Sequence, residues 1–117
     1  MGRLYYGSSL DPIEMPDRVL AHVKTVAATK LRRLESFTLT WTYGTEHEGG
    51  RSTVWLHCSI PLRFDFDTLE AQQLDRDYLQ ELAQAASSSA GIVLDLTENL
   101  TAIAEPVVLA TELVRAA

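Results

Sequence analysis

Two adjacent residues of this chain could together perform covalent chemistry, because Cys58 carries the only thiol and His57 could take its proton. Both lie within residues 51–67, where apolar side chains occupy the even positions from Val54 onward. Successive side chains of a β-strand point to opposite faces, so the two would face apart. We predict that Cys58 is buried between Leu56 and Ile60 as an inert apolar side chain.

Acidic residues and a second histidine offer other chemistry. Glu46, His47 and Glu48 could hold a metal ion, but they stand beside two glycines in a polar stretch, which is typical of a solvated turn. The aspartate pairs at positions 65/67 and 75/77 have no neighbouring base or nucleophile, and they are interpreted as solvating charges and helix caps. The sequence lacks HExxH, CxxC, EF-hand and phosphate-loop patterns. We therefore predict no catalytic residues, no metal, no cofactor and no enzymatic activity.

A binding surface is indicated by the polar positions of the same stretch. Residues 37–43 alternate strictly, with aromatic and leucine side chains on one face and threonines on the other. If this strand pairs with residues 51–67 as an antiparallel hairpin, the threonines share a face with Trp55. Exposed tryptophan beside arginine is typical of protein interfaces and of sites that stack single-stranded nucleic acid. The predicted binding residues on this face are Thr40, Trp55, His57 and Arg63; the alternatives are a face covered by a helix, or one tolerated surface aromatic.

A second candidate surface lies on a predicted helix over residues 16–34. Its apolar stripe consists of Val19, Leu20, Val23, Val26, Ala27, Leu31 and Leu34. The opposite side carries Arg18, His22, Thr25, Thr29, Arg32 and Arg33. Five basic and two acidic residues give positions 16–35 a net charge of +3. Arg18, Arg32 and Arg33 could contact phosphates, although such a side is more often an ordinary solvated helix face. Lys30 is the misfit of the apolar side, and its stem is expected to extend outward to water.

The elements that would position these residues form an α+β fold. Strands are predicted over 3–6, 13–15, 37–43 and 92–96, and a second helix over 75–88. Residues 51–67 form either one strand bent at Pro61 or two strands that share a core. The predicted order is β-β-α-β-β-β-α-β, an antiparallel sheet of five to six strands with two helices packed on one face. We assign residues 1–96 to a single domain. Residues 97–117 form a tail with a short helix over 106–115, docked on the domain, used in self-association, or frayed.

Composition limits the functional classes. The 117 residues are enough for one domain with a real core. The net charge of -6 argues against a surface that coats nucleic acid generally. A single cysteine fits a reducing compartment, and the sequence shows neither a signal peptide nor a run long enough to cross a membrane. We predict a cytoplasmic protein without membrane association.

Several segments resemble a family of small uncharacterised actinobacterial proteins, a domain of unknown function. The resemblance rests on KLRRLESF (30–37) and GRSTVWLHCSIPLRF (50–64), with support from MGRLYYG and SSSAG, and it covers about residues 1–95. That family usually reads HPS where this chain has His57, Cys58 and Ser59. Relatives are often labelled "ATP-dependent DNA ligase". The ligase nucleophile is a lysine in a KxDG setting, which neither Lys24 nor Lys30 provides.

These observations favour a non-enzymatic binding or interaction module, expected to self-associate or to bind a protein partner through the face of Trp55 and His57. The first alternative is a DNA-associated accessory protein, linked to repair or ligation, that uses Arg18, Arg32 and Arg33. The second is a small enzyme with an unrecognised site.

Overall fold

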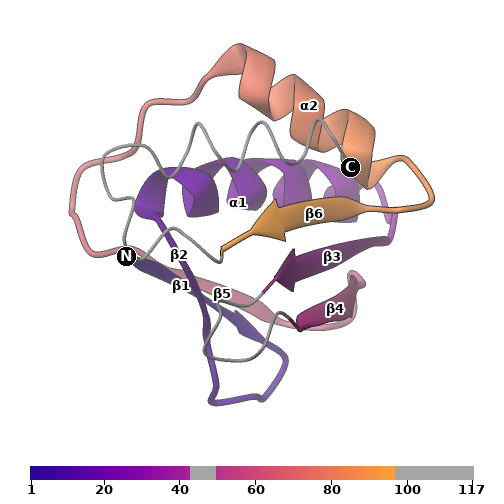
Figure 1. Ribbon diagram of the computed structural model, residues 1–117, viewed down its shortest axis with the longest axis horizontal. Coiled ribbons are helices and arrows are strands. Elements are labelled where there is room, and N and C mark those ends of the chain that lie inside the picture. The colour runs from indigo at the N-terminus through magenta and orange to yellow at the C-terminus, as the bar shows by residue number, and fades with distance from the viewer. Residues whose placement is uncertain (43–49, 97–117) are drawn as a thin grey trace.

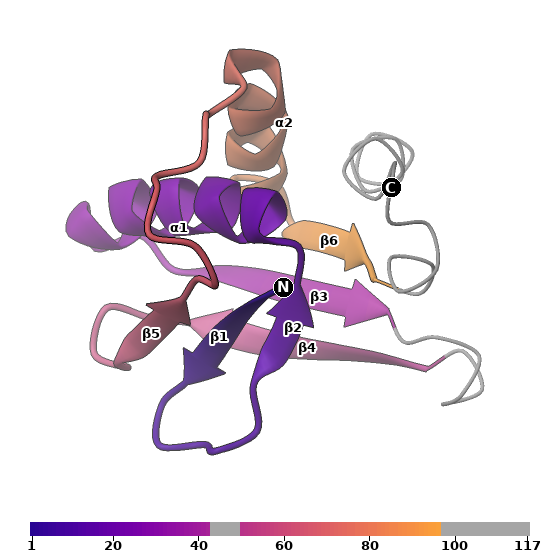
Figure 2. The ribbon, with the colours of Figure 1, turned by 90° about the vertical axis from the view of Figure 1, so that its left-hand side faces the viewer.

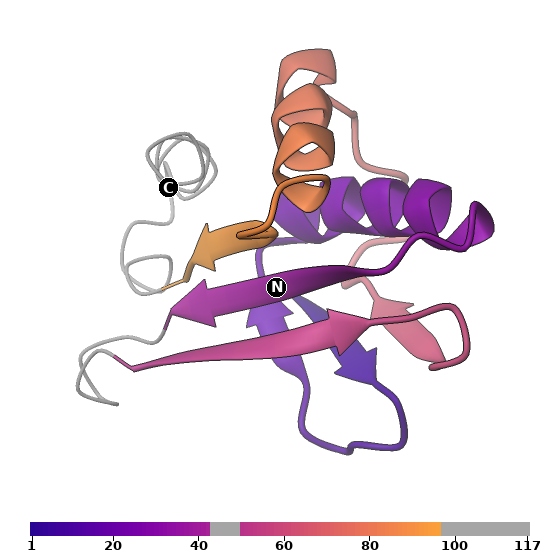
Figure 3. The same cartoon turned by 90° about the vertical axis from the view of Figure 1, so that its right-hand side faces the viewer.

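The computed structural model describes residues 1–42 and 50–96, which form two helices and six strands. The predicted α+β class is confirmed, and both helices lie on the same side of the strands (Figure 1; Figure 3). The Glu46–His47–Glu48 cluster and the tail after residue 96 lie outside the described residues. The elements are β1 (Gly2–Tyr6), β2 (Ile13–Met15), α1 (Asp17–Arg32), β3 (Phe37–Thr42), β4 (Arg51–Leu56), β5 (Leu62–Asp65), α2 (Arg76–Ala86) and β6 (Ile92–Asp95).

The strands form two three-stranded sheets, in the orders β2-β1-β5 and β4-β3-β6, so the prediction of one sheet was wrong. The division occurs between Leu56 and Leu62, where the chain turns and the Ile60 amide donates to the His57 carbonyl over 3.0 Å. After this turn the chain pairs with β1 instead of continuing beside β3. Of the two alternatives for residues 51–67, the structure has two strands that share a core.

The prediction that Cys58 is buried is also wrong. Cys58 lies in this turn, where it is exposed and its thiol is free. Strand parity places a side chain only while the chain remains extended, and β4 ends at Leu56. Leu56 is fully buried, whereas the alternation beyond it resumes in a different sheet. The apolar pattern continued through the turn because β4 and β5 both face the common core.

The predicted hairpin of β3 and β4 is confirmed as an antiparallel pair in which Thr38 lies opposite Trp55 and Thr40 opposite Thr53. Its inner face contributes Phe37, Leu39 and Leu56 to the core. The predicted antiparallel arrangement fails at β6, which runs parallel to β3. The chain reaches β6 through α2, and a crossover of this kind returns the chain in the direction of the earlier strand.

One hydrophobic core joins both sheets to both helices. It contains Leu4 and Met15 from the first sheet and Leu39 and Ile92 from the second. The buried side of α1 packs against these residues with Val19, Leu20, Val23, Val26 and Ala27, as the apolar stripe predicted. Leu34 does not extend the stripe, because α1 ends at Arg32 and Leu34 is exposed.

The predicted position of His22 on the helix was wrong. Its side chain is fully buried and does not lie on the outer side with Arg18. The ring Nε2 accepts the Asp75 amide proton over 2.8 Å. Nε2 is therefore unprotonated, and Nδ1 carries the ring proton and donates to the Arg18 carbonyl over 2.6 Å. Asp75 is the residue that caps α2, as predicted, and its carboxylate accepts from the amides of Asp77 and Tyr78. A neutral imidazole thus ties α1 to the start of α2.

This neutral imidazole predicts a loss of stability in mild acid. Burial lowers the pKa of His22 in the folded protein below 6.5, its ordinary value. At a pH between the lowered pKa and 6.5, the unfolded chain therefore binds a proton that the folded chain does not. Stability should be complete above about pH 6.5 and should fall below it by up to about 1.4 kcal/mol per pH unit. Urea denaturation at several pH values between about 7.5 and 5 measures this slope.

The matched control is His57→Gln, because His57 is partly exposed and lies in the turn after β4. His57→Gln should keep the slope, and His22→Gln should flatten it whatever its stability at neutral pH. A slope that disappears in His57→Gln and persists in His22→Gln would contradict the assignment.

The end of α1 carries backbone strain at Leu34, the one non-glycine residue with a positive φ, 63°, among those the structure describes. The Glu35 amide donates to the Lys30 carbonyl and the Leu34 amide to the Leu31 carbonyl, which is the Schellman arrangement of a helix end. The left-handed position of this motif is normally glycine, because a Cβ atom makes it unfavourable. The Leu34 side chain is also 76% exposed, so little packing offsets the strain.

Leu34→Gly is therefore expected to stabilise the protein by about 1 kcal/mol. Leu10→Gly is the control, since Leu10 is also exposed and is not among the residues with positive φ. It should leave stability unchanged or lower it, because glycine makes the unfolded chain more flexible. Thermal unfolding compares the two, and equal destabilisation by both would contradict the strain at Leu34.

Candidate functional site

Trp55 is the most exposed aromatic side chain of the described sheets, with 56% of its surface open to solvent. It lies one residue before the end of β4 and opposite Thr38, near the start of β3. The Tyr6 hydroxyl donates to the Trp55 carbonyl, which fixes the backbone that carries the indole. The predicted outer face is therefore not covered at Trp55 by any described helix.

The indole forms one wall of an open groove of about 560 Å³, here called the Trp55 groove. The end of α1 and the residues that follow it provide the opposite side, and the serines after α2 close one end. The position follows from the register, because only four residues separate Arg33 from Thr38 and Thr38 pairs with Trp55. The lining residues are Lys30, Arg33, Glu35, Ser36, Phe37, Thr38, Trp55, Ala86, Ser87, Ser88 and Ser89.

The charges of the groove are two basic groups and one acidic group. Lys30 is largely buried, and its ammonium donates to the Glu35 carboxylate over 3.0 Å and to the Ser87 hydroxyl over 2.9 Å. The predicted extension of Lys30 to water is therefore wrong, because its ammonium ends on a carboxylate and a hydroxyl of the protein. Arg33 is exposed and forms no ion pair with another described residue. The groove therefore carries a net charge of +1 on a protein of net charge -6.

Two residues predicted beside Trp55 do not belong to the groove. Thr40 is 8% exposed, and its hydroxyl shares a 2.7 Å hydrogen bond with the Thr53 hydroxyl, which leaves little of it for a ligand. His57 lies beyond the end of β4, where its Nδ1 contacts the Ser59 hydroxyl at 2.8 Å and the Ser59 amide at 3.1 Å. This ring nitrogen therefore organises the turn to β5, and His57 does not continue the face of Trp55.

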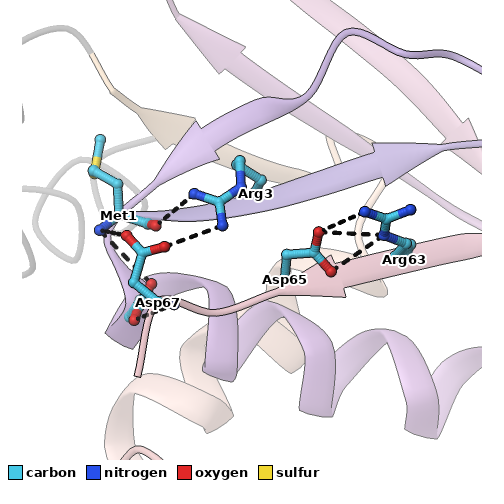
Figure 4. Close-up of polar contacts among 6 residues, drawn as sticks. Met1, Arg3, Arg63, Asp65 and Asp67 are labelled. Atoms are coloured by element: carbon cyan, nitrogen blue, oxygen red, sulfur yellow. Dashed lines mark hydrogen bonds and ion pairs between the residues drawn. The ribbon is translucent and has the colours of Figure 1, made fainter. Parts of the chain in front are cut away.

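Arg63 was also predicted on the Trp55 face, but it lies in the other sheet. It forms hydrogen bonds to both carboxylate oxygens of Asp65 (Figure 4). Its guanidinium carbon also lies over the Tyr5 ring, 4.7 Å from the ring centre. A second ion-pair cluster joins Asp67 to Arg3 and to the Met1 amino group. The Arg63 guanidinium lowers the pKa of Asp65, and the Met1 amino group and Arg3 lower that of Asp67. Asp67 thus links the segment after β5 to the start of the chain, whereas the Arg63–Asp65 pair lies within β5.

The three arginines predicted as a basic helix surface are separated by the structure. Arg18 stands at the start of α1, where it contacts Asp75 at 3.4 Å. Arg33 lies fifteen residues later, or about 22 Å along a helix, and lines the Trp55 groove. Arg32 is exposed at the same end of α1 but does not line the groove. Only Arg33 therefore combines with Trp55.

Sequence reasoning missed Glu35 and the serines at positions 87–89 as groove residues. The ESF and SSSAG segments carried a signal, since both belong to the resemblance, but their contact depends on the packing of α1 against α2. Gly91 allows the segment after α2 to approach β3 closely, because a Cβ atom there would meet the Thr38 hydroxyl at 2.0 Å. Its φ of 74° also requires glycine.

Among the described residues, no group of three or more His, Cys, Asp or Glu side chains could hold a metal ion. Neither α1 nor α2 has the length and apolarity that crossing a bilayer requires.

Comparison with known proteins gives a family but no characterised relative. No curated protein and no solved structure matches the chain. The model of one family, described as a domain of unknown function (DUF7882), matches residues 1–98. This match includes every residue of the Trp55 groove and both sheets, and the chain therefore belongs to the DUF7882 family.

Proposed function

We propose that the protein is a non-enzymatic binding module that holds an acidic, aromatic segment of a partner protein in the Trp55 groove. The observation that carries the proposal is that the exposed Trp55 lines the same groove as Arg33, which forms no ion pair with another described residue. A large rigid aromatic side chain beside an arginine is the combination that contributes most to protein interfaces. The Ser87–Ser89 hydroxyls add hydrogen-bonding groups at one end.

Charge favours an acidic ligand over a basic one. The local charge of +1 attracts a carboxylate, whereas the rest of the surface is acidic and repels it, so the carboxylate is directed to the groove. The described residues that line the groove include no histidine or cysteine, and the Lys30 ammonium is paired with Glu35. We also propose a cytoplasmic location, where the exposed thiol of Cys58 would remain reduced.

Selection of random peptides on the immobilised protein tests this proposal. Enriched peptides should carry an aromatic residue close to Asp or Glu, and a synthetic representative should bind in fluorescence anisotropy. Trp55→Ala should weaken its affinity about tenfold or more, and Arg33→Ala about fivefold. Trp55→Phe, which retains a smaller ring, should fall between the wild type and Trp55→Ala.

The control for Arg33→Ala is Arg76→Ala, which makes the same change of charge at an exposed position of α2 outside the groove. It should leave affinity unchanged. Enrichment of basic peptides, or equal binding by Trp55→Ala and the wild type, would refute the proposal.

A second candidate function is DNA-associated accessory binding, because Trp55 and Arg33 also suit a stacked base and its phosphate. The structure reduces the expected contacts from three arginines to one in the groove, with Arg32 nearby. Phosphate contacts release counterions, so few contacts imply a shallow dependence on salt.

For this candidate, a labelled single-stranded oligothymidine should bind at about 50 mM salt and should lose only about tenfold in affinity by about 200 mM. Trp55→Ala and Arg33→Ala should each weaken binding, and Arg18→Ala should not. Absence of binding at the lower salt concentration removes DNA from consideration and leaves the peptide experiment unaffected.

A further inference from the structure

A second surface suited to binding lies on the other side of α1, away from the Trp55 groove. Between β5 and α2 the chain passes over α1 (Figure 2) and encloses a hollow of about 230 Å³, here called the Leu69 hollow. It shares no lining residue with the Trp55 groove. Its lining residues are Ala21, Lys24, Thr25, Phe66, Thr68, Leu69, Glu70, Ala71, Gln72 and Leu74.

Apolar side chains form part of the walls of the hollow, and the apolar side chain of Leu69 is exposed beside it. Phe66, Leu74 and Ala21 contribute apolar surface to its walls. Leu69 is fully exposed at 106%, and Leu74 is 47% exposed. A cavity of about 150 Å³ is sufficient for benzene, so this hollow has room for a leucine side chain. One patch therefore presents both a leucine and a site that a leucine can fill.

The charges of the patch are also complementary to each other. Lys24 on α1 and Glu70 on the crossing segment both line the hollow. Neither forms an ion pair within the part of the chain that the structure describes, and Lys24 instead lies 5.8 Å from the Phe66 ring centre. Two copies related by a two-fold axis bring the same patch together, so each Lys24 can face the partner's Glu70.

We propose that the Leu69 hollow is a self-association surface. Leu69 of each copy enters the hollow of the other, and two Lys24–Glu70 pairs flank the contact. Because the opposite charges compensate within the patch, the net charge of -6 does not prevent the approach of two copies. The patch is small, so we expect a weak and reversible dimer with a Kd on the order of 10–100 µM.

Sedimentation equilibrium over a concentration series measures this Kd. Leu69→Asp should raise the Kd more than tenfold, because it places a charge in an apolar hollow. Leu10→Asp is the matched control, since Leu10 is 88% exposed in the connection between β1 and β2 and does not line the hollow. It should leave the Kd unchanged, and thermal unfolding should show that both variants fold.

Reversal of the charges tests the predicted pairing. Lys24→Glu and Glu70→Lys should each weaken the dimer by about fivefold, since each leaves like charges facing across the axis. The double variant Lys24→Glu/Glu70→Lys recreates both pairs and should recover most of the wild-type affinity. Trp55→Ala should have no effect on the dimer.

Three outcomes overturn the proposal. The first is a wild type that remains monomeric up to about 1 mM. The second is a Leu10→Asp variant that weakens association as much as Leu69→Asp. The third is a double variant no better than its single parents. A dimer lost in Trp55→Ala and kept in Leu69→Asp would instead place self-association at the Trp55 groove.

Discussion

The structure depends on a single core shared by two sheets, which no strand ladder joins within the described residues. Burial of α1 against this core holds the sheets in place. A polar bond also crosses between them, from the Tyr6 hydroxyl beside the first sheet to the Trp55 carbonyl of the second. Since apolar burial is not directional, such specific bonds are needed to fix how the sheets lie relative to each other.

His22 has the corresponding role between the helices. Its ring is buried beside Tyr78, with centroids 4.8 Å apart, and burial raises the pKa of the Tyr78 hydroxyl far above its usual range. The charge of Arg18 lowers the pKa of the His22 ring further, and the charge of Asp75 raises it. The position of α2, and with it the serines at the end of the Trp55 groove, therefore depends on an imidazole that must remain neutral.

Periodicity predicted the parts of the fold in which local pattern and burial agree. The apolar positions of β3 and of α1 are examples, because Phe37 and Leu39 and the stripe from Val19 to Ala27 all face the common core. His22 was misplaced because a helix wheel treats histidine as polar, whereas here the amide of Asp75 supplies a buried partner. Cys58 was misplaced because parity cannot detect a turn between two strands that face the same core. Trp55 was predicted as a binding residue, but its partner Arg33 was assigned to a different surface, since only the hairpin register places Trp55 beside the end of α1.

The hydrogen bond between the Tyr6 hydroxyl and the Trp55 carbonyl also affects how strands can add to the molecule. β4 is an edge strand, and an uncovered edge presents backbone groups on which a second chain can assemble. At Trp55 an incoming strand would meet a backbone carbonyl that already accepts a hydrogen bond from the Tyr6 hydroxyl. The Tyr6 phenol therefore makes this point of the β4 edge less available for the addition of a strand from another chain.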